Sequence, residues 1–509
     1  MRRMICMALA AVLLLAGCAT PSGGGSGGEQ EQTQEQAQVQ EQSQEEEAWE
    51  PVTVFPKTDA FVGDTMPYYE DGTMNVFYLA DQRDGKTGYH PWGLIRTQDY
   101  CSFEDMGIVI PYGDTIQDQD IALGTGCVIK DRSGGYHAFY TGHNDHFAPK
   151  EAIMHATSSD MLNWTKVPGD TFIASQEYSQ DDFRDPYVFY VEQEQCYWML
   201  VVTRSEGSGV IVKYTSKDLS KWEDGGIFFE DDMGYGTNME CPTLLQFGGR
   251  WYLSFSDQWP DRVVHYRISD SVNGPFVKPE RDTVDGNGFY AGRLETDGEH
   301  LYVVGWNGTK FDHEDENDYD WAGNMVVHQL EQQPDGTLRP VPNEKVVAAM
   351  SHALTLEPVL MTDTVTAEEN SFRLKGDQYE LVQFQALDGT TRLEADVSGW
   401  GEEDLFGLAF APDTENVGAM NYVFHPKENR VEFFNTDNIV EMDAQSFIDF
   451  DFSGRDSIHI TLLIGDGVAT LYLDNEAALT ARMYRSQGTN WQIFGVNSGV
   501  KWDNVSIFA

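Results

Sequence analysis

Three acidic residues stand at the start of apolar segments of this chain, where a carboxylate is unexpected. Asp64 lies in FVGDTMPYYEDG, Asp185 in FRDPYVFYVEQEQ and Glu240 in MECPTLLQFGGR. Two neighbouring carboxyl groups can cleave a glycosidic bond, because one attacks or activates water while the other, protonated, assists the leaving oxygen. A short Asp suits a fixed point of attack, and a longer Glu can reach a leaving group. A carboxylate active site is therefore the leading hypothesis.

Each acid also has a structural interpretation. Asp64 follows a glycine and fits a turn, and Asp185 lies between Arg184 and a proline, which fits an ion pair at a strand start. Glu240, before Cys-Pro, has less reason to stand beside an apolar strand. The three acids stand at the same phase of a repeated segment, which favours a shared catalytic role. If the segments are repeats of one propeller, the acids occupy equivalent positions and converge.

The repeat itself has five copies between about residues 52 and 345. Two further copies start without an acid, at GTGCVIKDRSGG from Gly124 and AGRLETDGEH from Ala291. A second pattern, an aspartate turn that ends in an aromatic ring, recurs with Asp at 99, 160 and 218 and in a degenerate form at 270. Such periods predict a five-bladed β-propeller whose first strands line one funnel. Each copy returns through an aromatic strand, at 76–81, 137–143, 197–204, 251–257 and 301–307.

The remainder of the chain predicts a different all-β unit. The propeller is expected over 51–345 and a connector over 346–365. From 366 to 509 alternating apolar and polar residues with frequent turns predict a β-sandwich. IGDG, between two alternating runs, predicts a tight hairpin.

The N-terminus predicts export. Two arginines precede a short apolar run that ends in Leu-Ala-Gly-Cys18, which resembles the bacterial lipoprotein box. Residues 1–18 are then a lipoprotein signal with Cys18 lipidated, and 19–50, Gly/Ser-rich and then Glu/Gln-rich, a disordered linker. We expect an extracytoplasmic protein, lipid-anchored to the cytoplasmic membrane at the bacterial cell surface. An ordinary secretory signal with a chance cysteine, and a fluctuating helix in the linker, are the alternatives.

Composition narrows the partners. With 33 basic and 83 acidic side chains, a formal charge of −50 argues against nucleic acid and anionic membrane surfaces and suits a neutral ligand. No CxxC or paired His spacing indicates a metal, and no cofactor is expected. Four cysteines remain beyond the signal, and both disulfides and free thiols stay open for them: Cys101, Cys127, Cys196 and Cys241.

Several other side chains are candidates for binding a sugar. Aromatic rings stack on sugar faces, and Trp92 is favoured because it follows the polar loop QRDGKTGY. Arg184 and His143 could bond the ligand. The further aromatic candidates are Phe61, Tyr68, Trp259, Tyr290 and Trp306, although core packing is the commoner role of such residues.

The ordered motifs resemble glycoside hydrolase family 32, the β-fructosidases. Arg-Asp-Pro at 184–186 and Glu-Cys at 240–241 resemble its two short signatures, and GTGCVI, YTGHN and GFYAGRLETDG resemble further propeller elements. HITLLIGDGVATLYLDNEAALTARMY resembles its C-terminal sandwich, with a Leu-Thr-x-Arg run. The resemblance implies Asp64 as nucleophile, Glu240 as general acid and base, and Asp185 as transition-state stabiliser.

One departure from the family concerns the nucleophile. The usual motif is of the type Trp-x-Asn-Asp-Pro-Asn-Gly, whereas this chain has Val-Gly-Asp64-Thr-Met-Pro. An unusual specificity is therefore expected. The family retains configuration, which requires nucleophile and acid roughly 5–5.5 Å apart.

These observations predict an exported retaining β-fructosidase acting on fructans or fructo-oligosaccharides, and the expected carbohydrate partner is a fructan, a fructo-oligosaccharide or sucrose. The alternatives are a fructosyltransferase with the same acids, a family 43-like arabinosidase or xylosidase, and a non-catalytic glycan-binding lipoprotein. Linkage, exo or endo action and oligomeric state stay open.

Overall fold

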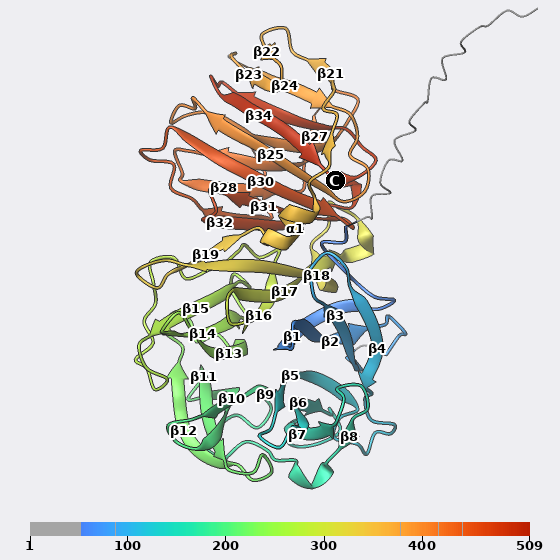
Figure 1. The fold of residues 1–509 in the computed structure, drawn as a ribbon, viewed down its shortest axis with the longest axis vertical. Helices are drawn as coiled ribbons and strands as arrows, with labels where there is room; N and C mark the ends of the chain where they lie inside the picture. Colours follow the sequence, from blue (N-terminus) through green and yellow to red (C-terminus); the bar gives the residue numbers. More distant parts are fainter. Residues whose placement is uncertain (1–51, 87, 377, 416, 440) are drawn as a thin grey trace, which may run out of the picture. The chain divides into compact units, whose positions relative to one another are not determined.

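The computed structural model describes residues 52–509 apart from 87, 377, 416 and 440. Segments 1–18 and 19–50, including Cys18, lie outside the described residues. In the described part, no helix is both long enough and apolar enough to cross a membrane. The chain is almost entirely β-strand, and the predicted all-β class is confirmed as a five-bladed propeller followed by a β-sandwich (Figure 1).

The first three blades each have four antiparallel strands. The first contains β1 (Phe61–Glu70), β2 (Thr73–Asp81), β3 (Trp92–Thr97) and β4 (Glu104–Ile110). The second contains β5 (Ala122–Lys130), β6 (Tyr136–His143), β7 (Glu151–Ser158) and β8 (Thr165–Lys166), followed by the 3₁₀ turn η1 (Pro168–Asp170). The third contains β9 (Phe183–Val191), β10 (Cys196–Ser205), β11 (Ser208–Ser216) and β12 (Glu223–Glu230).

The last two blades complete the ring. The fourth contains β13 (Met239–Phe247), β14 (Arg250–Asp257) and β15 (Val264–Ser269). The fifth contains β16 (Tyr290–Thr296), β17 (Leu301–Lys310), η2 (Phe311–His313), β18 (Tyr319–Gln332) and β19 (Leu338–Val341). Strands β1, β5, β9, β13 and β16 lie innermost around the centre of the ring (Figure 1).

All five inner strands carry a β-bulge at the same place. In each, two consecutive residues lie opposite a single residue of the neighbouring strand, which bends the inner strand and redirects its side chains. The predicted repeat phase therefore has a structural basis in one recurring backbone feature. The bulged pairs are Asp64–Thr65, Gly124–Thr125, Asp185–Pro186, Cys241–Pro242 and Ala291–Gly292.

The recurring aspartate turns are also real. Asp99, Asp160 and Asp218 each accept hydrogen bonds from backbone N–H groups two and three residues ahead. In all three turns the next residue has a positive φ, between 59° and 63°. The carboxylate satisfies the N–H groups that this backbone leaves unpaired. The degenerate copy differs, since Asp270 instead pairs with Arg250.

The ring closes where β18 pairs with β1. Val62, two residues before Asp64, pairs with Gly323, and this is the only pair in the register between β1 and β18. Gly323 has no room for a side chain, because a Cβ would lie 1.9 Å from the carbonyl oxygen of Asn307. The nucleophile candidate thus stands beside the seam between the first and last blades.

The second unit is a sandwich of two sheets around one apolar core. One sheet contains β20 (Ala353–Leu354), β22 (Thr366–Glu368), β23 (Ser371–Arg373), β25 (Thr391–Ser398), β30 (Ser457–Gly465), β31 (Val468–Leu473), β32 (Ala477–Arg482) and β34 (Lys501–Phe508). The other contains β21 (Pro358–Met361), β24 (Tyr379–Phe384), β26 (Leu405–Pro412), β27 (Gly418–His425), β28 (Arg430–Phe434), β29 (Ser446–Asp449) and β33 (Trp491–Val496). The 3₁₀ turn η3 (Tyr484–Ser486) follows β32.

Two local features qualify the sequence predictions. The IGDG hairpin forms as expected, with Asp466 and Gly467 both at positive φ between β30 and β31, the backbone that a type I′ turn requires. The expected connector, 346–365, begins inside helix α1 (Glu344–Ala349), and its strands β20 and β21 pair with β34 and β24 of the sandwich.

Candidate active site

The three acids come from three inner strands, but they occupy two levels of the funnel. Asp64 and Asp185 are each the first residue of a bulge, whereas Glu240 immediately precedes its bulge. Glu240 is thus level with Arg184 and Tyr290, which hold the same position in β9 and β16. The expectation of three equivalent positions is wrong by one residue for Glu240, whose longer side chain starts from the neighbouring level.

Glu240 is held by hydrogen bonds at both oxygens. Arg184 Nη2 lies 3.1 Å from its Oε1, and Gln258 Nε2 donates to the same oxygen over 3.0 Å. Tyr290 donates its hydroxyl to Oε2 over 2.6 Å. Burial raises the pKa of Glu240, the Arg184 charge opposes this, and the negative charge of Asp185 adds to it. A raised pKa favours the protonated form that a general acid needs.

Asp185 is buried and held at both of its carboxylate oxygens. It is 4% exposed, accepts a hydrogen bond of 2.5 Å from the Thr125 hydroxyl at Oδ1, and accepts one of 2.9 Å from the Cys241 backbone N–H at Oδ2. Its own N–H donates to Thr141 Oγ1 over 2.9 Å, and its φ is 58°. Both carboxylate oxygens are engaged, which suits an orienting or stabilising group better than an attacking one.

Asp64 has the freer carboxylate. Within residues 52–509 as described, its one side-chain hydrogen bond comes from Trp306 Nε1 to Oδ1, at 3.1 Å, which leaves Oδ2 available. Burial, together with the negative charges of Asp185 and Glu240, raises the pKa of Asp64 to about 7, although Trp306 and Arg293 oppose the rise. The mutual repulsion places the three acids in one electrostatic unit.

Arg293 is a buried positive charge close to the three acids. It is 1% exposed, donates from Nη1 to the Pro242 carbonyl over 2.7 Å and from Nη2 to the Thr125 hydroxyl over 3.3 Å. Thr125 in turn bonds Asp185. The guanidinium therefore supplies a fixed positive charge under a cluster of carboxylates, which offsets part of their repulsion.

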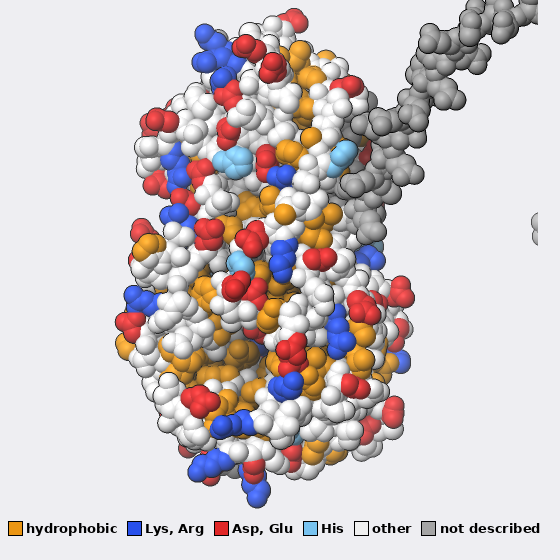
Figure 2. Space-filling model, viewed as in Figure 1, with side chains coloured by type: hydrophobic (Ala, Val, Ile, Leu, Met, Phe, Trp, Pro, Cys, Tyr) orange, Lys and Arg blue, Asp and Glu red, His pale blue; other side chains and the backbone are white. Residues whose placement is uncertain are grey.

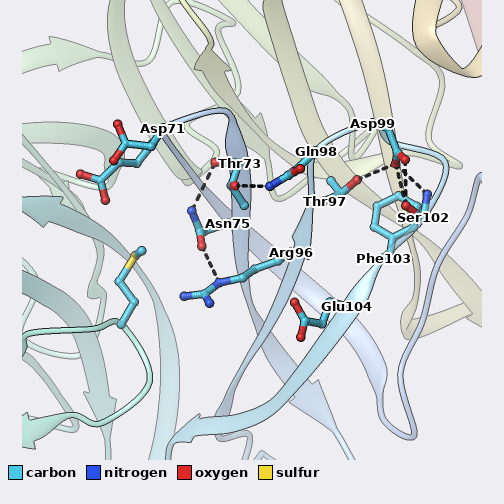
Figure 3. A pocket seen from close by; sticks show the side chains of 12 residues that line it. Asp71, Thr73, Asn75, Arg96, Thr97, Gln98, Asp99, Ser102, Phe103 and Glu104 are labelled. Carbon is cyan, nitrogen blue, oxygen red and sulfur yellow. Dashed lines mark hydrogen bonds between the residues drawn. The ribbon is translucent and has the colours of Figure 1, made fainter.

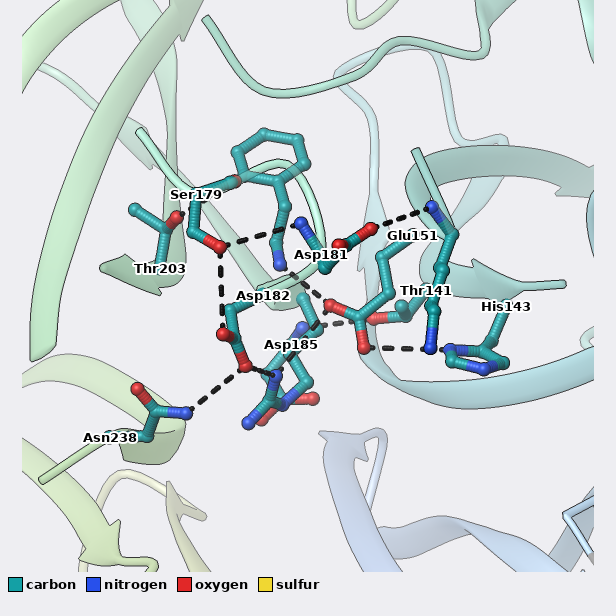
Figure 4. Close-up of polar contacts among 12 residues, drawn as sticks. Thr141, His143, Glu151, Ser179, Asp181, Asp182, Asp185, Thr203 and Asn238 are labelled. Carbon is teal, nitrogen blue, oxygen red and sulfur yellow. Dashed lines mark hydrogen bonds and ion pairs between the residues drawn. The ribbon is translucent and has the colours of Figure 1, made fainter. Parts of the chain in front are cut away.

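Asp182, Glu151 and His143, which are labelled in Figure 4, form a charged network with Arg184. Arg184 Nη1 lies 2.8 Å from Asp182 and 3.6 Å from Glu151. His143 Nδ1 faces Glu151 at 3.6 Å, and that carboxylate raises the pKa of the imidazole. Both predicted binding residues thus belong to one charged network, of which Arg184 is the member that touches Glu240.

The aromatic candidates have different roles. Trp306 bonds Asp64 directly, and Phe61 lies under the Arg83 guanidinium at 4.8 Å from the ring centroid. Trp92 is fully buried, donates Nε1 to the Gly124 carbonyl and packs within the apolar core between two blades. Its prediction as a sugar-stacking residue is wrong, because its ring is enclosed by protein on all sides.

Tyr290, Gln258, Thr125 and Arg293 are polar partners of the acids that residue-type reasoning did not identify as such. Tyr290 was expected only to stack on a sugar. Strand register identifies two of these partners. Tyr290 lies at the same level as Arg184 and Glu240, and Arg293 directly follows the bulge of β16. The level of a residue within a bulged strand is set by backbone pairing, which the residue types do not display.

The departure at Gly63 also has a structural explanation. A Cβ at Gly63 would lie 2.4 Å from the ring of Trp321 on β18. Trp321 stacks on His90 at 4.2 Å and packs edge-to-face on Trp306 at 5.9 Å. The tryptophan of the last blade therefore fills the space beside Asp64 that a side chain at position 63 would take.

An opening of about 240 Å³ lies beside two residues that donate to the acids, although none of the three acids belongs to its lining. Its lining includes Tyr290 and Trp306, the donors to Glu240 and Asp64, and Gln445 from the sandwich. The space-filling view shows a hollow over the blades with apolar side chains around it and charges of both signs scattered over the face (Figure 2). A larger hollow of about 540 Å³, lined by Asn75, Arg96 and the Asp99 turn, contains none of the acids and is a separate feature of the first blade (Figure 3).

The described residues contain no cluster of His, Cys, Asp and Glu suited to a metal ion, and their four cysteines are all free thiols.

A family model and several known proteins match this chain. The N-terminal domain model of glycosyl hydrolases family 32 matches residues 63–338. A levanase of Bacillus subtilis (strain 168) is 28% identical over 189 residues, 36% of this chain and 26% of the levanase, so the match spans about a quarter of that relative. A sucrose-6-phosphate hydrolase of Vibrio alginolyticus is 22% identical over 385 residues, 68% of this chain and 75% of that protein.

Solved structures share the fold. A family 32 β-fructofuranosidase of Bombyx mori superposes with a TM-score of 0.66 at 19% identity, over 90% of this chain and 93% of that one. The propeller and sandwich architecture therefore matches a known fold from end to end of the described residues. The inner strands are bulged, their carboxylates are linked, and the family model matches residues 63–338. This chain therefore belongs to glycosyl hydrolases family 32.

Proposed function

We propose that this protein is a retaining β-fructosidase that hydrolyses fructofuranosidic bonds in fructans, fructo-oligosaccharides or sucrose. The observation that carries the proposal is the division of labour between two linked acids. Glu240 is partly buried, with 17% of its side chain exposed, and is bonded at both oxygens, while Asp64 keeps one oxygen free. A proton donor beside an available nucleophile is the arrangement that retaining glycosidases use.

The reaction follows from these positions. Asp64 Oδ2 attacks the anomeric carbon of the fructosyl unit while Glu240 gives its proton to the leaving oxygen, so the glycosidic C–O bond breaks as the ester bond to Asp64 forms. Glu240, now ionised, takes a proton from water, and the water oxygen displaces Asp64. Two inversions give net retention. Asp185, fixed by Thr125 and Cys241, stabilises the positive charge that develops on the sugar ring.

The surroundings of the site favour neutral fructans over phosphorylated sugars. The opening beside the acids is lined by Asp261, Asp318 and Asp320, with Arg262 the only basic residue of its lining. A phosphate group would meet this excess of negative charge in a protein of formal charge −50. Among the named relatives, we therefore expect specificity nearer to the levanase than to the sucrose-6-phosphate hydrolase.

A product profile tests the proposal. The full chain is incubated with levan, inulin, sucrose and sucrose 6-phosphate, and the products are separated by anion-exchange chromatography, with early NMR spectra to identify the released anomer. Release of β-fructose from a fructan supports the proposal. New oligosaccharides in place of fructose would indicate a transferase, and arabinose or xylose released from model glycosides would indicate a family 43-like activity. If the protein binds fructan without turnover, and Asp64→Asn and Glu240→Gln do not change this, the protein is a glycan-binding protein rather than an enzyme.

We propose in addition that the protein is exported and anchored through a lipid on Cys18. The support is the sequence alone: a basic start, a short apolar run and Leu-Ala-Gly-Cys. Labelling cells with a clickable fatty acid tests it, with Cys18→Ala as control. Label that is present in the wild type and absent from the variant, together with accessibility to external protease, is the expected result. Equal labelling of both, or none, contradicts the anchor.

A further inference from the structure

The Leu-Thr-x-Arg run of the sandwich, Leu479 to Arg482 on β32, has no part in the mechanism above. Leu479 and Ala481 belong to the sandwich core. Alternate residues of a strand face opposite sides, so Thr480 and Arg482 share the other face. Both are almost fully buried, and both hydrogen-bond residues of the propeller's fifth blade.

Arg482 is bound to the end of β17 and to β18. Its Nη2 donates to the Asn307 carbonyl over 2.8 Å and its Nε to the Gly308 carbonyl over 2.9 Å. Its Nη1 donates to Asn324 Oδ1 over 2.9 Å, next to Gly323, which closes the ring against β1. Asn307 directly follows Trp306, the donor to Asp64. Arg482 therefore fixes the backbone beside that donor and the seam beside the nucleophile.

Thr480 is bound to the segment that enters β16. Its backbone N–H donates to Asp285 Oδ1 over 2.8 Å and its hydroxyl to Oδ2 over 2.6 Å. A Cβ at Gly288 would lie 1.9 Å from the Thr480 carbonyl oxygen, so the two backbones are in close contact. Two residues later comes Tyr290, the donor to Glu240.

The two anchored segments are also joined to each other. Asn307 donates its side-chain amide to the Gly288 carbonyl over 2.7 Å. Tyr290 and Trp306 are register partners across β16 and β17, and their rings pack edge-to-face with centroids 5.9 Å apart. One face of β32 thus supports the two adjacent residues that donate to the two catalytic carboxylates.

We propose that Thr480 and Arg482 of the sandwich are positioning residues for catalysis, Arg482 acting through Trp306 on Asp64 and Thr480 acting through Tyr290 on Glu240. This rests on the proposed β-fructosidase function. The sandwich is then part of the catalytic apparatus, although neither residue touches the acids. Small displacements of a positioned group cost large factors in rate, since catalysis depends on pre-set geometry.

The proposal predicts which side of the pH profile each variant changes. The Trp306 bond lowers the pKa of Asp64, which also faces Asp185, Glu240 and Arg293. Weakening that bond raises the pKa at which the nucleophile ionises, so the acid limb of kcat/KM moves to higher pH. The Tyr290 bond likewise lowers the pKa of Glu240, which also faces Arg184 and Asp185. Weakening it moves the basic limb to higher pH.

Three variants of the full chain and one matched control test this. Arg482→Met is expected to lower kcat about tenfold with little change in KM, and to raise the acid limb by about half a pH unit, the value of part of one hydrogen bond. Arg482→Lys keeps the charge but loses the planar fork, so a partial effect is expected. Thr480→Val is expected to raise the basic limb. Arg485→Met is the control, because Arg485 bonds Asp315 and Glu316 across the same interface but not the backbone at 307–308.

A double variant separates positioning from general destabilisation. If Arg482 acts through Trp306, Arg482→Met adds little to the loss already caused by Trp306→Phe. Full additivity contradicts the proposal, and so does an Arg482→Met enzyme with lower Tm but wild-type kcat and pH limbs. If Arg482→Met does not fold, Arg482→Lys and Thr480→Val carry the test, and wild-type kcat and limbs in both would overturn it.

A readout without turnover keeps the two proposals distinguishable. The pKa of Asp64 can be obtained from the Tm difference between Asp64→Asn and its parent as a function of pH. The midpoint of this difference should move to higher pH in the Arg482→Met background. An unmoved midpoint overturns the positioning proposal, whereas absence of fructosidase activity in the wild type overturns only the function.

Discussion

Tyr290 and Trp306 are paired across β16 and β17, and each donates one hydrogen bond to a different one of the two proposed catalytic carboxylates. Tyr290 holds Glu240 and Trp306 holds Asp64, although the two acids lie on strands of different blades. The fifth blade, which contributes none of the three acids, thereby holds both Asp64 and Glu240, the proposed nucleophile and proton donor. The proposed active site of this family 32 protein is formed by neighbouring blades rather than by any single repeat.

Removing either acid should abolish hydrolysis in different ways. Asp64→Asn and Glu240→Gln are each expected to lower kcat on a fructan by about a thousandfold, within the range for a lost acid–base or nucleophilic group. An activated fructoside whose leaving group needs no proton should distinguish them. Glu240→Gln should still give a rapid first release of that group in stopped-flow measurements, whereas Asp64→Asn should give none. An equal burst from both variants contradicts the assigned roles.

Asp64 should make the folded protein less stable as pH rises. Its pKa is about 7 in the folded protein, against 3.8 for the free group. A raised carboxyl pKa adds stability that is fully present below pH 3.8 and is lost as the pH rises through 7. About three pKa units at about 1.4 kcal/mol each set an upper bound of about 4 kcal/mol.

The measurement is the Tm of wild type and Asp64→Asn between pH 4 and 8. The variant has no carboxylate to ionise, so its Tm advantage should grow from pH 4 to about 7 and then level off. Asp413, an exposed acid in a sandwich turn, offers a control as Asp413→Asn. A constant difference across this range, or one that shrinks with rising pH, is inconsistent with the raised pKa.

Position 63 should tolerate a side chain only when Trp321 is made smaller. Gly63→Ala places a methyl group 2.4 Å from the Trp321 ring, so Trp321 or the Asp64 backbone must move. We expect kcat/KM to fall at least tenfold, as small displacements near the chemistry do. Gly63→Ala combined with Trp321→Leu should recover part of the loss relative to Trp321→Leu alone. Strictly additive losses would mean that the two positions do not compete for space.

Trp92 and Trp306 should respond differently to the same substitution. Trp92→Phe removes a buried ring portion and the hydrogen bond to Gly124, and is expected to cost about 1–3 kcal/mol of stability with unchanged KM and kcat in the folded enzyme. Trp306→Phe removes the donor to Asp64 and should lower kcat and raise the acid limb of the pH profile. Chemical denaturation with parallel kinetics measures both. An altered KM in Trp92→Phe would indicate that Trp92 belongs to the substrate-binding site.

The stability of the protein should not depend on reducing agents, because the thiols of the described residues are free. Cys101, Cys127, Cys196 and Cys241 are all free, and burial raises the pKa of Cys127 to about 12 and that of Cys101 to about 11, which keeps these thiols protonated and unreactive. Dithiothreitol should leave the Tm unchanged, and thiol titration should detect Cys127, Cys196 and Cys241 only after unfolding, whereas the partly exposed Cys101 should react slowly in the folded protein. A fall in Tm on reduction would indicate a disulfide.

Much of this architecture follows from patterns that are local in the sequence. Aspartate turns at 99, 160 and 218 recur because a short side chain that bonds its own backbone needs no distant partner. Alternation and the IGDG turn predict sandwich strands for the same reason. Asp64, Asp185 and Glu240 stand out as carboxylates beside apolar strands, where only a local partner or a function would keep them. The three acids, the blade count and the family resemblance were therefore accessible before the fold.

Other features depend on pairings between distant residues, which no local pattern records. Whether Glu240 lies level with Asp185 or with Arg184 is set by strand register at a bulge, and Trp92 is core rather than binding surface because another blade covers it. The space beside Gly63 is filled from 258 residues further along the chain, by Trp321. The sequence alone determined which groups could do the chemistry. Only the tertiary structure decided which hydrogen bonds hold them, because every side-chain donor except Gln258 comes from a different blade than the acid it holds. We propose that two of these donors also depend on a strand of the sandwich.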